Sequence, residues 1–361
     1  MNLTKDQREA INKITKFFNQ DKDTLFVLNG KAGTGKSEIL KHIIEKELVS
    51  HCSYLAPTNK ARNNVNNRLK EERVETIHSF LFYSHLGEDG KLYFKDRNNY
   101  NKNIIVDEYS MVGNSLLNKI KGSSSKVCLI GDNNQLPPVK DSTPSLKINY
   151  NLDKVIRSED KIVQLSHSVI NDKYFNSRKI PREYFVDDKK MIEICSRENL
   201  QILCYTNKTR IRTNKIVRKV LERKNDIEYG DKMITLFNLD FLPKSEVVKI
   251  EEVFAKGDSD VYRTTISFDG RCYGVRAFKQ HLNALAYKDI REIRPRYGAR
   301  GNDNFVGLDY AYCLTTHRFQ GSEADEVLVM LEPSLEGKAL YNRWLYTSIT
   351  RAKKKIYFYK V

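Results

Sequence analysis

The sequence lacks the features that mark membrane and secreted proteins. None of its 361 positions opens a run of 18 apolar residues, which argues against a membrane-spanning helix. The first twenty residues have no apolar signal-peptide core, since Lys5, Asp6, Arg8 and Glu9 mix both signs of charge. Its six cysteines are scattered, without a CxxC pair or metal-ligand spacing. We therefore expect a cytoplasmic protein with reduced thiols, and neither a zinc module nor a membrane partner.

Internal repeats and low-complexity tracts are missing too, as is any extra carboxylate cluster of the kind that a nuclease would need. What the chain does have is 361 residues, 40% of them hydrophobic and 30% charged. That composition supports packed cores rather than disorder. The length suits two or three domains.

Positive charge exceeds negative charge in both halves of the chain. Lys and Arg number 62 against 46 Asp and Glu, which gives a net charge of +16. A basic surface spread over folded domains suits a polyanion such as nucleic acid. A lysine-rich coding bias with a solvated surface explains the same numbers, so charge alone leaves both interpretations open.

Short β-branched or aromatic runs alternate with longer amphipathic stretches, which is typical of a parallel α/β fold. The strands predicted in this way are Leu25–Leu28, Ser53–Ala56, Ile104–Val106, Lys126–Ile130, Gln201–Tyr205, Ala311–Thr315, Glu326–Leu331 and Lys355–Tyr359. The predicted helices are Lys5–Asn19, Lys36–Val49, Lys60–Lys70, Lys208–Arg223 and Leu335–Thr350.

Two stretches interrupt this alternation. Within 79–103, the runs Phe80–Tyr83 and Lys91–Phe94 flank a polar Gly-containing turn, which predicts a β-hairpin. Within about 231–309, the runs Glu246–Phe254, Val261–Phe268 and Cys272–Phe278 are separated by Gly-Asp and Asp-Gly pairs. This second pattern predicts a small antiparallel sheet inserted into the second α/β unit.

The sequence GKAGTGKS at 30–37 fits the phosphate-binding pattern G-x-x-x-x-G-K-[ST]. A predicted strand precedes it and a predicted helix follows, so a chance Gly-rich turn is a poor explanation. Glycines let backbone N–H groups face the phosphates, Lys36 adds a positive charge and the Ser37 hydroxyl can ligate Mg²⁺. The residues expected to bind the nucleotide are Gly30, Lys31, Ala32, Gly33, Thr34, Gly35, Lys36 and Ser37.

Acidic and amide groups follow two further predicted strands. Asp107 ends an apolar strand, and a carboxylate there is costly unless it meets a cation such as Mg²⁺. Glu108 is then placed to orient or activate the attacking water. Gln135, in the string GDNNQLPP, could contact the terminal phosphate or its water. The sequence thus indicates a bound nucleotide together with Mg²⁺.

Further motifs occur in a fixed order. They are APTNKA (56–61), TIHSF (76–80), IIVDEYSM (104–111), GDNNQLPPV (131–139), VIRS (155–158), CYTNKTR (204–210), TTHRFQGSEADEV (315–327) and LYTSITRAKKKIYFY (345–359). With the phosphate loop, this order resembles that of superfamily 1 helicases over nearly the whole chain. It is most similar to the RecD-like branch, and within it to the phage Dda-type helicases.

The resemblance implies a fold of two RecA-like P-loop domains with ATP between them. Domain 1A would comprise 1–78 and 104–150, and domain 2A would comprise 151–230 and 310–361. The hairpin at 79–103 would be a strand-separating pin (1B), although it is short for one. The insert at 231–309 would be an SH3-like domain (2B).

The same resemblance assigns further nucleotide contacts. Gln7 matches the glutamine that reads adenine, and Gln320 and Gly321 match the positions that couple the second domain to ATP. Arg351 matches the arginine finger, and Arg157 a second phosphate-contacting arginine. An arginine delivered from the second domain would make hydrolysis depend on domain closure.

Small polar or imidazole groups match family positions that face the nucleic-acid strand without reading bases. These are Pro57, Thr58, Asn59 and His78 in the first domain, and Thr206, Asn207, Thr316 and His317 in the second. In the hairpin, Phe80, Phe82 and Tyr93 could stack on a base, as could Tyr83 and Phe94. Hairpin side chains alternate between two faces, so half of these aromatics could instead attach the pin to the first domain.

One motif departs from the family pattern. Arg318 and Phe319 stand where a lysine and a small residue are more usual, and the resemblance assigns no contact to either.

The resemblance implies an ATP-dependent DNA helicase that moves 5′→3′ on single strands and unwinds duplex DNA. Its partners would be single-stranded and forked DNA and proteins of replication, repair or recombination, and it would act as a monomer in a bacterial or phage-infected cell. An RNA helicase stays open, because backbone-tracking residues hardly discriminate without contacts to the 2′-OH. An ATP-switched DNA-binding mediator that never unwinds is disfavoured by the complete set of Lys36, Asp107, Glu108 and Arg351.

Overall fold

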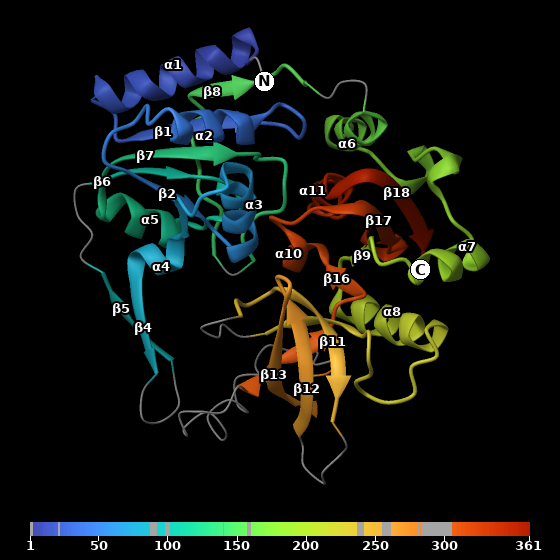
Figure 1. Ribbon diagram of the computed structural model, residues 1–361. Helices are drawn as coiled ribbons and strands as arrows, with labels where there is room; N and C mark the ends of the chain where they lie inside the picture. Colours follow the sequence, from blue (N-terminus) through green and yellow to red (C-terminus); the bar gives the residue numbers. More distant parts are fainter. Residues whose placement is uncertain are drawn as a thin grey trace.

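A computed structural model of the protein describes most of the chain (Figure 1). The described residues are 3–20, 22–86, 92–97, 102–139, 141–156, 160–236, 242–254, 261–279, 282 and 305–361, with the side chains of 84–86, 92–94 and 102 excepted. Within these ranges no helix has the length and apolar character needed to cross a bilayer.

A parallel sheet organises the first part of the chain, with strands in the order β3-β2-β6-β7-β1-β8. Phe26 and Leu28 pack with helices α1 to α3, whereas Val27 packs on the opposite face with α4 and α5. Both faces are covered, so these strands are almost wholly apolar. The elements are α1 (Lys5–Asn19), β1 (Leu25–Gly30), α2 (Lys36–Glu45), β2 (Cys52–Ala56), α3 (Asn59–Leu69), β3 (Val74–Thr76), α4 (Ile77–Leu81), β6 (Lys102–Val106), α5 (Asn114–Gly122), β7 (Ser124–Gly131) and β8 (Tyr150–Leu152).

A second parallel sheet, in the order β16-β9-β17-β18, organises the rest. Leu203 and Val329 pack against α6 and α11 on one face, and Ile202 and Leu328 face α7 and α8 on the other. The elements are α6 (Lys161–Asn171), α7 (Asp188–Cys195), β9 (Leu200–Cys204), α8 (Asn207–Val220), β16 (Cys313–Thr315), α10 (Thr316–Phe319), β17 (Ala324–Leu331), α11 (Tyr341–Ile349) and β18 (Ala352–Lys360). Single 3-10 turns lie at Tyr109–Met111, Ser177–Lys179, Arg182–Tyr184 and Pro333–Leu335.

A third sheet is inserted between α8 and β16, in the order β14-β13-β12-β11-β10-β15. Its pairs are antiparallel except β13 with β14, which confirms the expected small antiparallel sheet. Ile250, Ile266 and Val275 join the core beneath the second sheet. Its strands are β10 (Lys232–Thr235), β11 (Val247–Val253), β12 (Val261–Phe268), β13 (Arg271–Phe278), β14 (Phe305–Val306) and β15 (Leu308–Tyr310).

The predicted hairpin is present as β4 (Phe82–Leu86) and β5 (Leu92–Asp96), an antiparallel pair. Figure 1 shows it extending from the first sheet toward the lower side of the view, where the third sheet also lies. Its turn falls outside the described residues. At its base, the Lys119 ammonium lies 2.9 Å from the Asp96 carboxylate and 4.9 Å from the centre of the Phe82 ring.

Several element boundaries differ from the sequence prediction. Phe80 was expected in the hairpin strand but lies in α4, because Thr76 caps a helical turn there by accepting the Ser79 N–H. The helix from Lys36 ends at Glu45, and the positive φ of Glu47 stops it. The last helix begins at Tyr341 rather than Leu335, since Gly337 adopts φ +80°.

Candidate nucleotide and nucleic-acid sites

The phosphate loop connects β1 to the N-terminus of α2, as the motif predicts. Gly33 and Gly35 adopt φ of +82° and +83°, a region that glycine enters without steric cost. Lys36 Nζ donates to the carbonyl oxygens of Gly30 (2.6 Å) and Lys31 (3.0 Å), so the ammonium lies against the first arm of the loop. Loop amides, the helix N-terminus and this ammonium together suit an anion.

Gln7 lies beside this loop, where the resemblance places it. Its side chain completes a capping box with Thr4 at the start of α1, and its Nε2 donates to Gly35 O (3.3 Å). A Cβ on Gly35 would lie 2.3 Å from Gln7 Nε2 and 2.7 Å from Ile156 Cδ1. The left-handed backbone conformation therefore favours glycine at this position, and a Cβ would also displace the ends of the Gln7 and Ile156 side chains.

Asp107 and Glu108 follow β6 at the same edge of the sheet. Burial, reinforced by the charge of Glu108, raises the pKa of Asp107 to about 7, while the nearby Lys36 charge lowers it. Glu108 adopts φ +53°, and its Oε2 is buried without a hydrogen-bond partner in the structure. A buried carboxylate with a raised pKa beside an orphaned carboxylate oxygen fits a site that receives a hard cation and a water.

Ala32 lies within the loop and is held from both sides by the second unit, which is the second parallel sheet with its helices; the first unit is the first parallel sheet with its helices. Its N–H donates to Tyr346 Oη (2.7 Å), and the Tyr346 hydroxyl in turn donates to Asp132. His167 Nε2 lies 3.1 Å from Ala32 O and must donate, because a carbonyl only accepts. Helices α11 and α6 thus reach the phosphate loop directly.

The loop after β7 is bound by the same helix. Arg343 donates from Nε to Gln135 O and from Nη2 to Asn133 O, both at 2.8 Å. Gln320 Nε2 donates to Leu136 O (3.1 Å). Gln135 itself is buried at the junction. The structure therefore brings Gln135 and Gln320 to the interface that also contains the phosphate loop.

Arg351 is 5% exposed just beyond the end of α11. Its guanidinium donates to Thr347 O (3.1 Å), Ser322 O (3.3 Å) and Thr350 Oγ1 (3.2 Å), all in the second unit. Its helix touches the phosphate loop through Tyr346, but the guanidinium bonds to its own unit. Arg157 lies outside the described residues, so its role stays a prediction.

Thr58 and Thr206 occupy equivalent positions in the two units. Each lies two residues after a parallel strand and caps the following helix: Thr58 Oγ1 accepts the Ala61 N–H, and Thr206 Oγ1 accepts the Thr209 N–H, both at 3.1 Å. Asn207 is exposed beside the second cap, and Pro57 and Asn59 are partly exposed beside the first. Helix N-termini flanked by small polar side chains are suited to phosphate contacts.

The structure corrects two of the nucleic-acid residues. Phe80 is 2% exposed in the core of the first unit, so its ring offers no face to a base. Thr316 is fully buried, and its hydroxyl bonds with Ser348 Oγ (2.8 Å) and Trp344 Nε1 (2.8 Å). Neither side chain is available to a strand, because apolar packing in one case and internal hydrogen bonding in the other satisfies it.

The other predicted strand contacts remain accessible or lie outside description. His78 is exposed, with its ring centre 5.9 Å from that of Phe82, which is partly buried. His317 is partly buried, with its ring edge-to-face to Tyr205. Desolvation of the ring lowers the pKa of both histidines below its usual value, and for His78, which is exposed as a residue, the nearby Lys244 charge lowers the pKa further. The side chain of Tyr93 lies outside the described residues.

The unusual pair Arg318 and Phe319 makes contacts that the resemblance could not assign. Arg318 Nη1 lies 3.6 Å from the Asp309 carboxylate of β15, which also pairs with Arg210 of α8. The Phe319 ring lies beneath Lys60 Nζ of α3, 5.2 Å from the ring centre. One residue therefore ties α10 to the third sheet, and the other ties it to the first unit.

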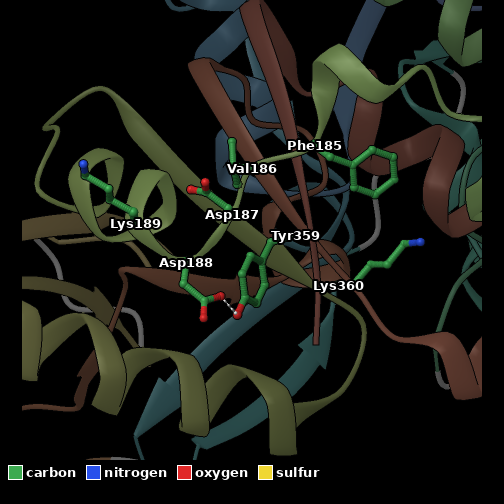
Figure 2. A pocket seen from close by; sticks show the side chains of 7 residues that line it. All are labelled: Phe185, Val186, Asp187, Asp188, Lys189, Tyr359 and Lys360. Atoms are coloured by element: carbon green, nitrogen blue, oxygen red, sulfur yellow. Dashed lines mark hydrogen bonds between the residues drawn. The ribbon is translucent and has the colours of Figure 1, made fainter.

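An open pocket elsewhere contains none of the predicted site residues. It lies at the β18 edge of the second sheet and is lined by Phe185, Val186, Asp187, Asp188, Lys189, Tyr359 and Lys360 (Figure 2). A hydrogen bond from Tyr359 to Asp188 (2.7 Å) crosses it. This pocket adds nothing to the nucleotide site.

Sequence reasoning missed His167, Arg343 and Tyr346. Arg343 and Tyr346 lie in or beside the quoted motif at 345–359, so their position in a motif-bearing helix was a usable signal. His167 lies in an ordinary amphipathic helix, and only the packing of α6 on the loop reveals its contact.

Comparisons with known proteins agree with this geometry. Residues 7–141 match a family model described as an AAA domain, and residues 310–359 match a UvrD-like helicase C-terminal domain. The two matched segments contain the phosphate loop and α11 respectively.

Curated relatives are distant. The chain is 24% identical to the RecBCD enzyme subunit RecD of Buchnera aphidicola, over 98% of this chain and 73% of that one. It is 25% identical to the ATP-dependent DNA helicase dda of phage T4, over 68% and 65% respectively. The chain spans only 36% of an uncharacterized Methanocaldococcus protein and 58% of an uncharacterized mimivirus protein that it also matches.

Among solved structures, the Bacteroides Pif1 helicase in complex with ADP-AlF3 and ssDNA is similar in fold. The TM-score is 0.58 at 16% identity, over 99% of this chain and 92% of that one. The similarity covers nearly the whole chain. It confirms an α/β fold with mixed sheets, similar to that of Pif1.

Proposed function

We propose that this protein, a superfamily 1 chain of the RecD-, Dda- and Pif1-like kind, is an ATP-dependent DNA helicase that moves 5′→3′ on single strands and unwinds duplex DNA. The observation that carries the proposal is the junction at Ala32. There the phosphate loop of one unit meets the helix of the other unit that leads to Arg351. A nucleotide at such a junction can bias the relative position of two units, which is what a motor needs.

The same proposal assigns each sheet to a domain. The two parallel sheets would be RecA-like domains 1A and 2A, with the nucleotide between them. The hairpin at 79–103 would be the 1B pin and the antiparallel sheet at 231–309 an SH3-like 2B domain. Supporting this, β4–β5 projects from the first sheet, and the third sheet is packed beneath the second.

Roles within the nucleotide site follow from the contacts. Gln7 would read adenine beside Gly35, and the amides of the loop with Lys36 would bind the phosphates. Ser37 and Asp107 would hold Mg²⁺, which would neutralise phosphate charge. Glu108 would orient the attacking water through its orphaned oxygen.

Three groups would complete the site at the terminal phosphate. Gln135 and Gln320 lie at the junction and would contact the phosphate or its water. Arg351 would exchange its bonds to Thr347 and Ser322 for the transferring phosphoryl group when the units close. Arg157 would add a second arginine.

The proposed track for a single strand runs across the helix caps of both units. Thr58 and Thr206 would place the N-termini of α3 and α8 against successive phosphates, with Asn59, Asn207 and His317 beside them. Relative motion of the two units would then change the distance between the two helix N-termini that contact the strand. The ssDNA bound to the Pif1 neighbour supports DNA as the strand.

Unwinding of forked duplexes tests the proposal. Substrates with a 5′ tail, a 3′ tail or no tail, in DNA and in RNA, are incubated with the protein and ATP. We expect release of the DNA strand with the 5′ tail alone. Faster release of RNA strands would mean that the substrate is RNA. Release with 3′ tails would mean that the direction is 3′→5′. Stimulated ATPase without any strand release would support an ATP-switched mediator instead.

The pin assignment predicts a separation of two activities. Replacing 87–92 by a short turn should leave single-strand-stimulated ATPase within about twofold, because none of the nucleotide or strand groups lies in that turn. Unwinding should fall by tenfold or more, since stacking on the displaced pair, about 1–3 kcal/mol per base, is comparable to the stacking lost per opened step. Parallel ATPase and strand-release assays measure both. If both fall together, the hairpin is a structural part of the first unit, and if unwinding is undiminished, the wedge lies elsewhere.

A further inference from the structure

Two side chains of the second unit form hydrogen bonds with Ala32, and their chemistry bears on how this unit detects a nucleotide. The two groups that hold this residue, the Tyr346 hydroxyl and His167 Nε2, both act as hydrogen-bond donors. Tyr346 donates to Asp132 while it accepts the Ala32 N–H, and His167 donates to Ala32 O. Donors at this place are suited to an anion as well as to a carboxylate or a carbonyl.

The contacts of Lys36 show which phosphates would come near this pair. Its ammonium touches Gly30 O and Lys31 O, the residues directly before Ala32. In the motif this ammonium serves the β- and γ-phosphates. The charges of Lys36 and Asp132 both act on the pKa of His167, which burial lowers. Ala32 therefore lies at the terminal-phosphate end of the loop.

We propose that His167 and Tyr346 form a positioning pair with which the second unit distinguishes a nucleoside triphosphate from a diphosphate. A terminal phosphate offers the His167 N–H a charged acceptor in place of the neutral Ala32 carbonyl, and it competes with the Asp132 carboxylate for the Tyr346 hydroxyl. That exchange moves the donors of α11 and α6 from Asp132 and the Ala32 carbonyl to the phosphate itself. After the terminal phosphate leaves, both donors return to Asp132 and Ala32 O.

The position of the pair explains how the signal would travel. Tyr346 lies within α11, and Arg351 lies just beyond the end of this helix, about one and a half turns further along the chain. A shift of α11 that brings Tyr346 to the phosphate therefore also moves the arginine. Arg343, on the same helix, already binds the loop after β7 through Gln135 O and Asn133 O. The pair thus acts on a rigid element that already joins two nucleotide motifs.

The inference rests on the proposed function, and nucleotide selectivity tests it separately. Dissociation constants for ADP and for adenylyl-imidodiphosphate, a triphosphate that resists hydrolysis, are measured with Mg²⁺ by calorimetry on the full chain. The variants are Tyr346→Phe, which deletes only the hydroxyl, His167→Gln, which keeps a side-chain N–H, and His167→Ala, which removes it. Tyr341→Phe is the matched control, because it removes a hydroxyl from the same helix where the hydroxyl bonds Glu336.

We expect Tyr346→Phe to weaken the triphosphate analogue about tenfold, equivalent to about 1.4 kcal/mol, while ADP affinity stays within twofold. His167→Gln should weaken the analogue less than His167→Ala does, and Tyr341→Phe should change neither nucleotide. Thermal unfolding of each variant with saturating ADP monitors folding.

Equal weakening of both nucleotides, or no weakening of either, would overturn the pair as a sensor and leave it a structural contact. A wild-type chain that binds neither nucleotide would instead overturn the proposed ATPase. The two failures are therefore distinguished by the wild-type measurement alone.

Discussion

Replacing Glu108 with glutamine is expected to lower single-strand-stimulated ATP turnover by at least about a hundredfold while ATP affinity stays within a few-fold. A positioned general base contributes about 10²–10⁴ in rate, and glutamine keeps the size of the side chain without its basicity. Glu108 follows β6 with a buried oxygen that has no hydrogen-bond partner among the described residues, as a group reserved for a water would. Turnover with saturating oligonucleotide and equilibrium binding of a nucleotide analogue measure the two effects.

Two further variants serve as controls for this experiment. Lys36→Ala should lose nucleotide binding itself, so residual turnover in its preparation reports contaminating ATPase. Glu75→Gln, an exposed carboxylate on β3, should behave as wild type. Wild-type turnover of Glu108→Gln in a preparation whose Lys36→Ala counterpart is silent would refute the assignment.

The sequence predicted the strand, the glycine-rich loop and the helix at the candidate nucleotide site of the first unit well, because the signals there are local. The glycine pattern, the strand before it and the helix after it lie within about 25 residues, and the structure has α1 at Lys5–Asn19 as expected. Asp107 could be assigned because a carboxylate at the end of a buried strand has few inexpensive explanations. Each of these inferences depends on neighbours in sequence.

Inferences that depend on distant neighbours were weaker. Nothing local shows that His167 of α6 faces the phosphate loop, or that Tyr346 bonds Asp132, because these contacts span 135 and 214 positions. Thr316 looked available as a polar residue, yet tertiary packing surrounds it with Ser348, Trp344 and the Cys204 carbonyl. Side-chain accessibility is a property of packing, which motif spacing does not report.

The departure from the family pattern at Arg318 and Phe319 also shows that motif spacing does not report side-chain contacts. Phe319 and Arg318 differ from the usual residues, and the structure gives each a new contact rather than leaving a defect. Asn64 of α3 adds a hydrogen bond to Gly321 O (2.6 Å), and a Cβ on Gly321 would lie 3.2 Å from the Ala61 nitrogen. This chain therefore joins α3, which carries the Thr58 cap, to the Gln320 segment by close packing.

Replacing Arg351 with alanine is expected to lower turnover about 10³-fold or more, with a much smaller effect on nucleotide affinity. An arginine finger contributes about 10³–10⁵ in rate, because it stabilises charge that develops only during phosphoryl transfer. The guanidinium is already desolvated and held by backbone carbonyls of Thr347 and Ser322, neutral acceptors that a phosphate can outcompete. Single-turnover and steady-state ATPase assays measure the loss.

Stability must be separated from chemistry in that variant. Removing the guanidinium takes a donor from the Ser322 carbonyl, whereas the Thr347 carbonyl keeps the Thr350 hydroxyl, and a buried unsatisfied group costs about 1–3 kcal/mol. Arg351→Lys keeps a charge and a donor but not the planar fork, so it should fold better than the alanine variant and still turn over at least about tenfold more slowly than wild type. Lys353→Ala, an exposed lysine two residues away, should leave the rate unchanged. If Arg351→Lys folds normally and retains full turnover, the arginine is a structural tie within the second unit, and hydrolysis takes its positive charge from elsewhere, with Arg157 the next residue to replace.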